Sequence, residues 1–175
     1  MHGPRTCFPG WYNHPMIRPA TPSDAPAITA IYNPYVADTI ISFETAPVPD
    51  EEMAGRIRRI QENYPWYVRE EDGVILGYAY ASQWKSRHAY RFAVETTVYV
   101  APDQVRRGVG AGLYRTLLPD LKARGYHTAM GGISLPNAAS VALHEHCGFK
   151  WAGTLPEVGW KLDRWVDVGY WALLL

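Results

Sequence analysis

The order of the predicted secondary-structure elements constrains the fold of this chain more than any other feature. A short strand at 16–18 is followed by two segments with apolar residues at helical spacing, at 28–35 and from Asp50 to before Tyr64. Three strand-prone runs come next, at 66–70, 74–82 and 93–100. Because this order lacks the regular strand–helix alternation of a doubly wound sheet, it predicts an α/β fold with a mixed, mostly antiparallel central sheet flanked by helices.

The second half of the chain continues this pattern. A leucine series from Leu113 to Leu121 predicts a helix, and Pro119 inside it predicts a kink or an early end, since proline costs about 3 kcal/mol in a helix interior. The remaining elements are expected at 128–133 (strand), 137–147 (helix), 149–154 (strand) and 165–174 (strand). We expect one domain over residues 16–175, preceded by an irregular extension over 1–15 that is rich in proline and glycine.

Composition limits the classes of partner. Lys plus Arg and Asp plus Glu both total 17, so no overall field favours nucleic acid or an anionic membrane. Cys7 and Cys147 form neither a disulfide framework nor a metal-ligand spacing. No apolar run approaches the roughly 20 residues of a membrane helix. We therefore expect a cytoplasmic protein that binds no metal, nucleic acid or membrane.

A glycine-rich segment follows the predicted strand at 93–100 and opens the next helix. Glycines at 108, 110 and 112 let an anion approach the backbone N–H groups, and the helix dipole adds roughly 0.3 to 1 kcal/mol. Arg106 and Arg107 are available as charged partners. The pattern by itself is equally compatible with a pyrophosphate site and with a flexible turn that has solvated arginines.

Several motifs beyond this segment carry a family resemblance. Val98-Tyr99-Val100, Arg107-Gly108-Val109-Gly110, Asn137, Leu143-His144-Glu145 and Gly148-Phe149 together resemble the GCN5-related N-acetyltransferase (GNAT) superfamily, over about residues 17–174. Trp84-Lys85, Ala89-Tyr90 and Asp167-Val168-Gly169 are among the stretches that resemble its phosphinothricin and methionine sulfoximine acetyltransferases. The resemblance implies a GNAT fold, acetyl-CoA as co-substrate, a homodimer and a link to herbicide resistance.

The resemblance also implies where acetyl-CoA binds. The backbone of Val98, Tyr99 and Val100 would pair with the pantetheine arm as an added strand would, and Asn137 would contact the cofactor. The pyrophosphate would rest on Arg106, Arg107, Gly108, Val109, Gly110 and Ala111. Val105 stands where the superfamily usually has Gln or Arg, so we expect this segment to act through its backbone.

Two titratable residues are candidates for proton transfer. An ammonium substrate must lose a proton before it attacks a thioester, and Glu95, among the apolar residues of the 93–100 strand, is predicted to be the general base. Its alternative role is an ordinary solvent-facing glutamate. His144 lies two helical turns after Asn137 and is predicted to act as an acid or a second base, the alternative being a partly exposed structural histidine.

The resemblance implies an amine pocket for a small amino acid. Such a substrate needs a cation for its carboxylate and an aromatic wall for its body, and the predicted residues are Phe43, Lys85, Arg87, Tyr90 and Arg91. The expected reaction is acetyl transfer to the α-amino group of phosphinothricin or methionine sulfoximine or sulfone. The alternatives are another amine (a polyamine, an aminoglycoside or a protein N-terminus) and a non-catalytic acyl-CoA-binding module. The C-terminal tryptophans are expected in the core or in a subunit interface.

Overall fold

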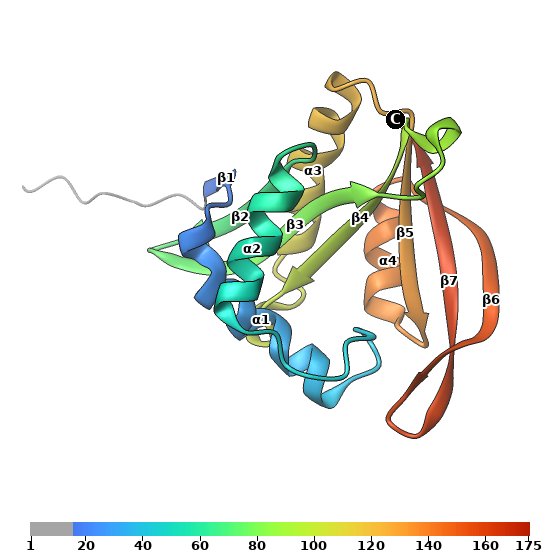
Figure 1. The fold of residues 1–175 in the computed structure, drawn as a ribbon, viewed down its shortest axis with the longest axis horizontal. Helices are drawn as coiled ribbons and strands as arrows, with labels where there is room; N and C mark the ends of the chain where they lie inside the picture. The colour runs from blue at the N-terminus through green and yellow to red at the C-terminus, as the bar shows by residue number, and fades with distance from the viewer. Residues whose placement is uncertain (1–15) are drawn as a thin grey trace, which may run out of the picture.

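The computed structural model describes residues 16–175, and the predicted extension over 1–15 lies outside them. One seven-stranded sheet has the order β1-β2-β3-β4-β5-β7-β6, and only β4 and β5 are parallel (Figure 1). The strands are β1 (Met16–Pro19), β2 (Trp66–Glu71), β3 (Val74–Gln83), β4 (Ala93–Val100), β5 (Thr128–Leu135), β6 (Lys150–Lys161) and β7 (Arg164–Leu174). The predicted α/β class and the mostly antiparallel sheet are confirmed.

Helices pack on both faces of this sheet. α1 (Ala25–Asp38) and α2 (Asp50–Gln61) bury Ile28 and Ile57 against one face, together with Tyr78 of β3. α3 (Val109–Ala123) buries three leucines against the other face, and α4 (Ala138–His146) packs on that side too. None of the helices within 16–175 has the length and apolar character needed to cross a membrane.

Pro119 does not end α3, which runs on to Ala123. The prediction of an early end was wrong because tertiary packing outweighs the local cost. Leu117 and Leu121, on either side of the proline, are both fully buried. Burial of such side chains contributes about 1.5 to 3 kcal/mol each, against about 3 kcal/mol for the interior proline.

The C-terminal hairpin is longer than its sequence pattern indicated. β6 continues past the predicted end at Thr154 to Lys161 and pairs with β7, forming the long hairpin at the edge of the sheet in Figure 1. The pairing shifts register twice, between Trp151 and Gly153 and between Leu155 and Gly159. Each shift interrupts the alternation of side chains between the two faces of the sheet. The sequence of β6 therefore lacks the period-two pattern from which a long strand would be predicted.

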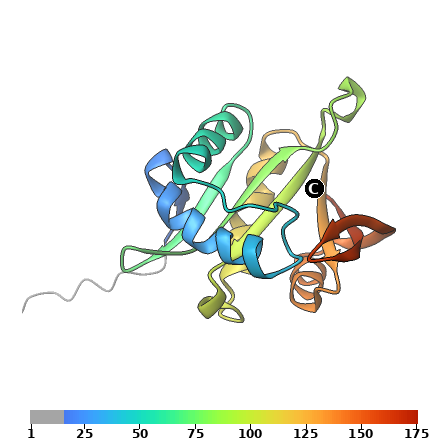
Figure 2. The same cartoon turned by 60° about the horizontal axis from the view of Figure 1, so that its bottom comes forward.

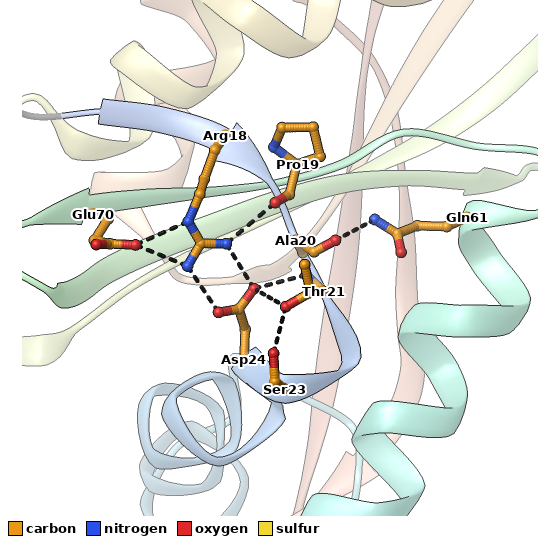
Figure 3. Close-up of polar contacts among 8 residues, drawn as sticks. All are labelled: Arg18, Pro19, Ala20, Thr21, Ser23, Asp24, Gln61 and Glu70. Carbon is orange, nitrogen blue, oxygen red and sulfur yellow. Dashed lines mark hydrogen bonds and ion pairs between the residues drawn. The ribbon is translucent and has the colours of Figure 1, made fainter.

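Arg18 ties the first strand to its neighbours. Its guanidinium lies 2.8 Å from a carboxylate oxygen of Asp24, before α1, and 2.8 Å from one of Glu70, on β2 (Figure 3). It also donates to the carbonyl oxygen of Pro19 at 3.2 Å. The Asp24 side chain also accepts the backbone N–H of Thr21 at 2.7 Å, so the network joins β1, β2 and the entry to α1.

Asp24→Asn is expected to lower the free energy of unfolding by about 1.5 to 3 kcal/mol at neutral pH, the typical value of a hydrogen bond to a charged group. The guanidinium of Arg18 holds the pKa of Asp24 below its usual range. The carboxylate therefore stabilises the fold above the unfolded-state pKa of about 4, and this contribution is lost as the pH falls through the lower native pKa. Urea unfolding should show that the difference in the free energy of unfolding between wild type and Asp24→Asn is smaller at about pH 2 than at about pH 7. Asp163→Asn, at an exposed position, is the control. An advantage that does not change with pH would contradict this role.

Candidate active site

The site begins where two neighbouring strands separate. β4 and β5 pair only through Ala93–Glu95 and Thr128–Met130, after which β4 stays beside β3 and β5 beside β7 (Figure 1). The N–H of Ala101 donates to the carbonyl of Leu76 on β3 at 2.9 Å. Because backbone groups alternate in direction along a strand, Val98 and Val100 point away from β3 and toward the opened side.

This opened side offers backbone groups that a ligand can bind. Val98 presents its N–H and its carbonyl, and Val100 presents its N–H, whereas the Val100 carbonyl accepts from the Tyr35 hydroxyl at 2.6 Å. Tyr99 is paired with Tyr78 of β3, so its backbone groups are not available to a ligand. Of the three residues expected to pair with the pantetheine arm, Val98 and Val100 remain. An amide-bearing chain can join such an edge as an added strand does.

The phosphate loop, residues 106–111, has the geometry of an anion site. Arg106 and Gly108 are in the left-handed region with φ of 65° and 72°, and the first helical hydrogen bond of α3 runs from the N–H of Gly112 to the carbonyl of Gly108. The N–H groups of Val109, Gly110 and Ala111 therefore have no acceptor within the helix. Such convergent donors at a helix N-terminus favour a phosphate group.

The glycines of this segment also serve helix packing. A Cβ at Gly110 would lie 2.8 Å from Cδ2 of Leu143 on α4, and one at Gly112 would lie 3.0 Å from Nη1 of Arg69. Arg106 and Arg107 are exposed, and the Arg107 guanidinium lies 3.6 Å from Glu71. The loop therefore places backbone N–H groups that have no acceptor within the helix next to two exposed cations.

A cavity of about 200 Å³ opens between the separated strands and α4. It brings together five predicted residues: Glu95, Val98, Tyr99, Asn137 and His144. Its wall also contains Ser134, whose Oγ is buried and has no hydrogen-bond partner within the described residues. A buried hydroxyl without a partner usually marks a place where a ligand or water completes the hydrogen bonding.

Glu95 lies half-buried where the β4–β5 pairing ends. Burial raises the pKa of its carboxyl above the usual value, and the nearby Lys85 partly opposes that rise. A Cβ at Gly132 of β5 would lie 3.1 Å from Oε1 of Glu95 and 3.3 Å from the Tyr170 ring, so no side chain separates the carboxylate from the opened strand. A carboxylate with a raised pKa beside an open cavity suits a general base.

His144 is held on the α4 side of the cavity with 3% of its surface exposed. Its Nδ1 lies 2.8 Å from the carbonyl oxygen of Ser140, so Nδ1 carries the proton and donates. Its Nε2 is then an acceptor, 3.0 Å from the hydroxyl of Tyr114. Burial lowers the pKa of this imidazole, which favours the neutral ring at pH 7. The alternative considered from the sequence, a partly exposed structural histidine, therefore does not apply.

Asn137 caps α4, because its side-chain oxygen accepts the backbone N–H of Ser140 at 3.1 Å. The cap leaves its amide nitrogen available, and the residue lines the cavity together with His144. Asn137 therefore precedes α4 rather than lying within the predicted helix over 137–147.

The predicted amine-pocket residues are less concentrated than the sequence suggested. Lys85 lies near Glu95, with its Nζ over the Trp84 ring at 4.8 Å. Like Lys85, the other predicted residues of the β3–β4 loop, Arg87, Tyr90 and Arg91, are exposed and do not line the cavity. Phe43 lies in the α1–α2 loop, with its ring against Gly159 of β6.

Sequence reasoning missed four features of this site: Ile41, Ser134, Gly132 and the contact of Tyr170 with Trp84. Ile41 and Ser134 line the cavity, and the Tyr170 ring packs edge-on against Trp84 at a centroid distance of 5.2 Å. Gly132 had a usable signal, since glycine inside a strand often marks a close approach of another group. The others lie on distant segments and carried none.

Comparison with known proteins agrees with this geometry. The chain matches the acetyltransferase (GNAT) domain family over residues 17–169. It is 43% identical to phosphinothricin N-acetyltransferase of Streptomyces viridochromogenes, over 89% of this chain and 85% of that protein. It is 38% identical to the L-methionine sulfoximine/L-methionine sulfone acetyltransferase of Salmonella typhimurium, over 91% and 94%. The structure of a GNAT superfamily phosphinothricin acetyltransferase from Sinorhizobium meliloti in complex with AcCoA aligns with a TM-score of 0.88 and 34% identity, over 92% of this chain and 88% of that one.

Proposed function

Because this chain belongs to the acetyltransferase (GNAT) family and to its phosphinothricin and methionine sulfoximine group, we propose that it acetylates the α-amino group of a small amino acid of that kind. The chain is an acetyl-CoA-dependent N-acetyltransferase. The observation that carries the narrower proposal is the position of Glu95, a half-buried carboxylate with a raised pKa that lines an open cavity and lies near Lys85.

The chain's residues fit acetyl-CoA. The free N–H groups of Val109, Gly110 and Ala111 would hold the pyrophosphate, and the backbone of Val98 and Val100 would pair with the amide-bearing arm. The unpartnered Ser134 hydroxyl and the free amide nitrogen of Asn137 remain available inside the cavity. When bound, acetyl-CoA supplies the thioester carbonyl that the amine attacks.

Glu95 acts as the general base in this proposal. The substrate nitrogen arrives as an ammonium group, and the Glu95 carboxylate takes one of its protons directly or through one water. The nitrogen's electron pair is then free to form the amide bond while the carbon–sulfur bond breaks. The CoA sulfur leaves with the bonding electrons, and the second proton that the nitrogen loses converts this thiolate to the free thiol. Burial raises the pKa of Glu95 toward the pKa of the substrate ammonium group. Proton transfer to Glu95 is therefore easier than to an ordinary carboxylate. This role is typically worth about 10²- to 10⁴-fold in rate.

We propose for His144 a different role from the acid or second base predicted from the sequence. With its proton on Nδ1, the ring has none to donate at Nε2, where it accepts from Tyr114. The lowered pKa keeps the ring neutral at pH 7. We assign His144 as a neutral acceptor that orients the Tyr114 hydroxyl, which also lies 3.3 Å from Thr96 Oγ1 on β4.

The substrate's own groups find partners around Glu95. Lys85 supplies a cation for the carboxylate of an amino acid, and Trp84 with Tyr170 forms an aromatic wall on the same side. The neighbourhood of a single lysine favours an amino acid with one carboxylate over a polyamine. Phosphinothricin and methionine sulfoximine both have this α-amino and α-carboxylate pair, and herbicide tolerance would follow from acetylation of the former.

The exposed aromatic residues of the C-terminal hairpin support a homodimer. Trp151, Trp160 and Trp165 are 63%, 53% and 59% exposed on β6 and β7, and β6 is an edge strand of the sheet. Large aromatics are enriched at subunit interfaces, and a second copy of the chain would cover both the rings and the edge. The same proposal assigns the enzyme to the cytoplasm, where acetyl-CoA is available.

Acetyl transfer to a panel of amines tests this proposal. The purified protein is incubated with acetyl-CoA and phosphinothricin, methionine sulfoximine, methionine sulfone, spermidine, an aminoglycoside or a peptide N-terminus, and release of free thiol is followed. We expect release with the three amino acids, with kcat/KM at least about 10²-fold above the other amines, because only they can pair with Lys85 while presenting an α-amine to Glu95. Release of free thiol with only spermidine or the aminoglycoside would show that the acceptor is a polycation and not a small amino acid. Binding of CoA without release from any amine would contradict the enzymatic proposal.

A further inference from the structure

The loop between α1 and α2 reaches across to the C-terminal hairpin (Figure 2). It spans residues 39–49, and Ile41 within it lines the active-site cavity. The next residue, Ser42, is buried. One wall of the cavity is therefore a loop without regular secondary structure, and the contacts at Ser42 and Phe43 hold it in place.

Lys161, the last residue of β6, makes one of these contacts. Its ammonium group donates to the carbonyl oxygen of Ser42 at 2.6 Å, although the two residues are 119 positions apart in the chain. Only 5% of Lys161 is exposed, which is unusual for a lysine. Burial lowers the pKa of this amine, and Glu44 opposes that shift. Within residues 16–175, Lys161 has no carboxylate partner at bonding distance, and a buried lysine of this kind is costly. The proposed mechanism above does not use it.

Gly159 of β6 makes the second contact, with Phe43. A Cβ at position 159 would overlap the Phe43 ring. Gly159 has no positive φ, so its backbone alone does not require glycine. The absence of a side chain is explained by the aromatic ring that occupies its place.

The helical layer holds the same loop from the other side. The Tyr32 hydroxyl of α1 lies 2.6 Å from Oγ of Ser42, and Arg56 of α2 forms an ion pair with Glu44. Ser42 is thus bonded through its side chain to α1 and through its carbonyl to β6. Tyr32 also packs edge-on against Tyr99 of β4, at a centroid distance of 4.9 Å.

We infer that Lys161 and Gly159 are positioning residues for the amine-binding side of the active site: they fix Ile41 and Phe43 by holding the α1–α2 loop against the hairpin. Neither residue touches the reacting atoms. The inference rests on the proposed function only in naming the amine as the substrate affected. Acetyl-CoA should bind independently of this contact, because its proposed partners lie on β4, α3 and the start of α4.

Lys161→Met tests the hydrogen bond, since methionine retains an apolar chain of similar length but cannot donate. We expect the KM for the amine to rise about fivefold to tenfold, the typical equivalent of one hydrogen bond, with the KM for acetyl-CoA changed less than about twofold. Lys150→Met, at an exposed position on the same strand, is the matched control and should change neither. Equal increases in both KM values, or none, would overturn the inference.

Hydrogen exchange gives a measurement that does not depend on turnover. Amides of residues 40–45 should exchange faster in Lys161→Met than in wild type or Lys150→Met, while those of α3 stay unchanged. Unchanged exchange in the loop would overturn the inference even if activity were altered. If the wild-type protein acetylated none of the amines tested, the proposed function would fail, and this exchange measurement would still decide whether Lys161 holds the loop.

A double-mutant cycle tests the packing contact and remains available if Lys161→Met does not fold. Gly159→Ala displaces the Phe43 ring and should raise the amine KM about tenfold. In a Phe43→Ala background no ring is left to displace, so the same glycine substitution should have little further effect. Additive effects of the two substitutions would show that Gly159 acts elsewhere and would overturn its assignment.

Discussion

Glu95→Gln is expected to lower kcat/KM about 10²- to 10⁴-fold near neutral pH and much less at high pH. Glutamine is close in shape to glutamate but cannot accept the proton of the substrate ammonium. As the pH rises toward the pKa of the amine, more substrate arrives already deprotonated, so the base matters less. Initial rates of free-thiol release from about pH 6 to about pH 10 measure this convergence.

The raised pKa of Glu95 also predicts the direction in which kcat/KM of the wild-type enzyme changes with pH. Burial raises the pKa of Glu95, so its base form, and with it kcat/KM, should increase as the pH rises through a value above the usual 4.3 for glutamate. The Gln variant should lack this rising limb. Glu62→Gln, an exposed residue at the end of α2, is the control and should retain the wild-type profile. If Glu95→Gln lowered kcat/KM by the same factor at every pH, Glu95 would not be the general base.

Gly132→Val is expected to reduce kcat/KM by about 10²-fold or more without unfolding the protein. The first added carbon would already lie 3.1 Å from Oε1 of Glu95, and the two methyl groups would fill the space between the separated strands. Valine is well tolerated in strands, so the sheet should remain intact. The effect should therefore appear in ligand binding and turnover rather than in the melting temperature.

Calorimetric titration with CoA separates these effects. Binding should weaken at least about tenfold in Gly132→Val, because the arm and the valine compete for one space. Thr128→Val is the matched control, since residue 128 lies on the same face of β5 but where β4 and β5 are still paired. Undiminished CoA binding and turnover in Gly132→Val would show that the ligand does not enter between these strands.

The local patterns of the sequence were sufficient for most elements and for the centre of the site. The strand predicted at 93–100 matches β4, and hydrophobic spacing gave the helices, because one buried stripe or face fixes each period. The wall of one cavity contains Glu95, Asn137 and His144. These residues meet because the cavity lies between β4, which carries Glu95, and α4, which begins after Asn137 and carries His144. The family resemblance, rather than spacing alone, singled these residues out.

Long-range contacts account for most of what the sequence did not reveal. The contact of Lys161 with Ser42 and that of Tyr170 with Trp84 join segments that are far apart in the sequence, and no local pattern encodes them. The protonation of His144 was likewise inaccessible, since it depends on Ser140 and Tyr114. The exposed loop residues Arg87, Tyr90 and Arg91 were predicted from residue type and the family resemblance. Their positions depend on the course of a loop, which sequence periodicity does not specify.

Identification of the product tests the central claim most directly. Methionine sulfoximine and phosphinothricin are incubated separately with the protein and acetyl-CoA, and the products are analysed by mass spectrometry and NMR. The account predicts one acetyl group on the α-amino nitrogen and one free CoA thiol per product, both lost together in Glu95→Gln at neutral pH. Thiol release without an N-acetylated amino acid, or full product formation by the Gln variant, would contradict it.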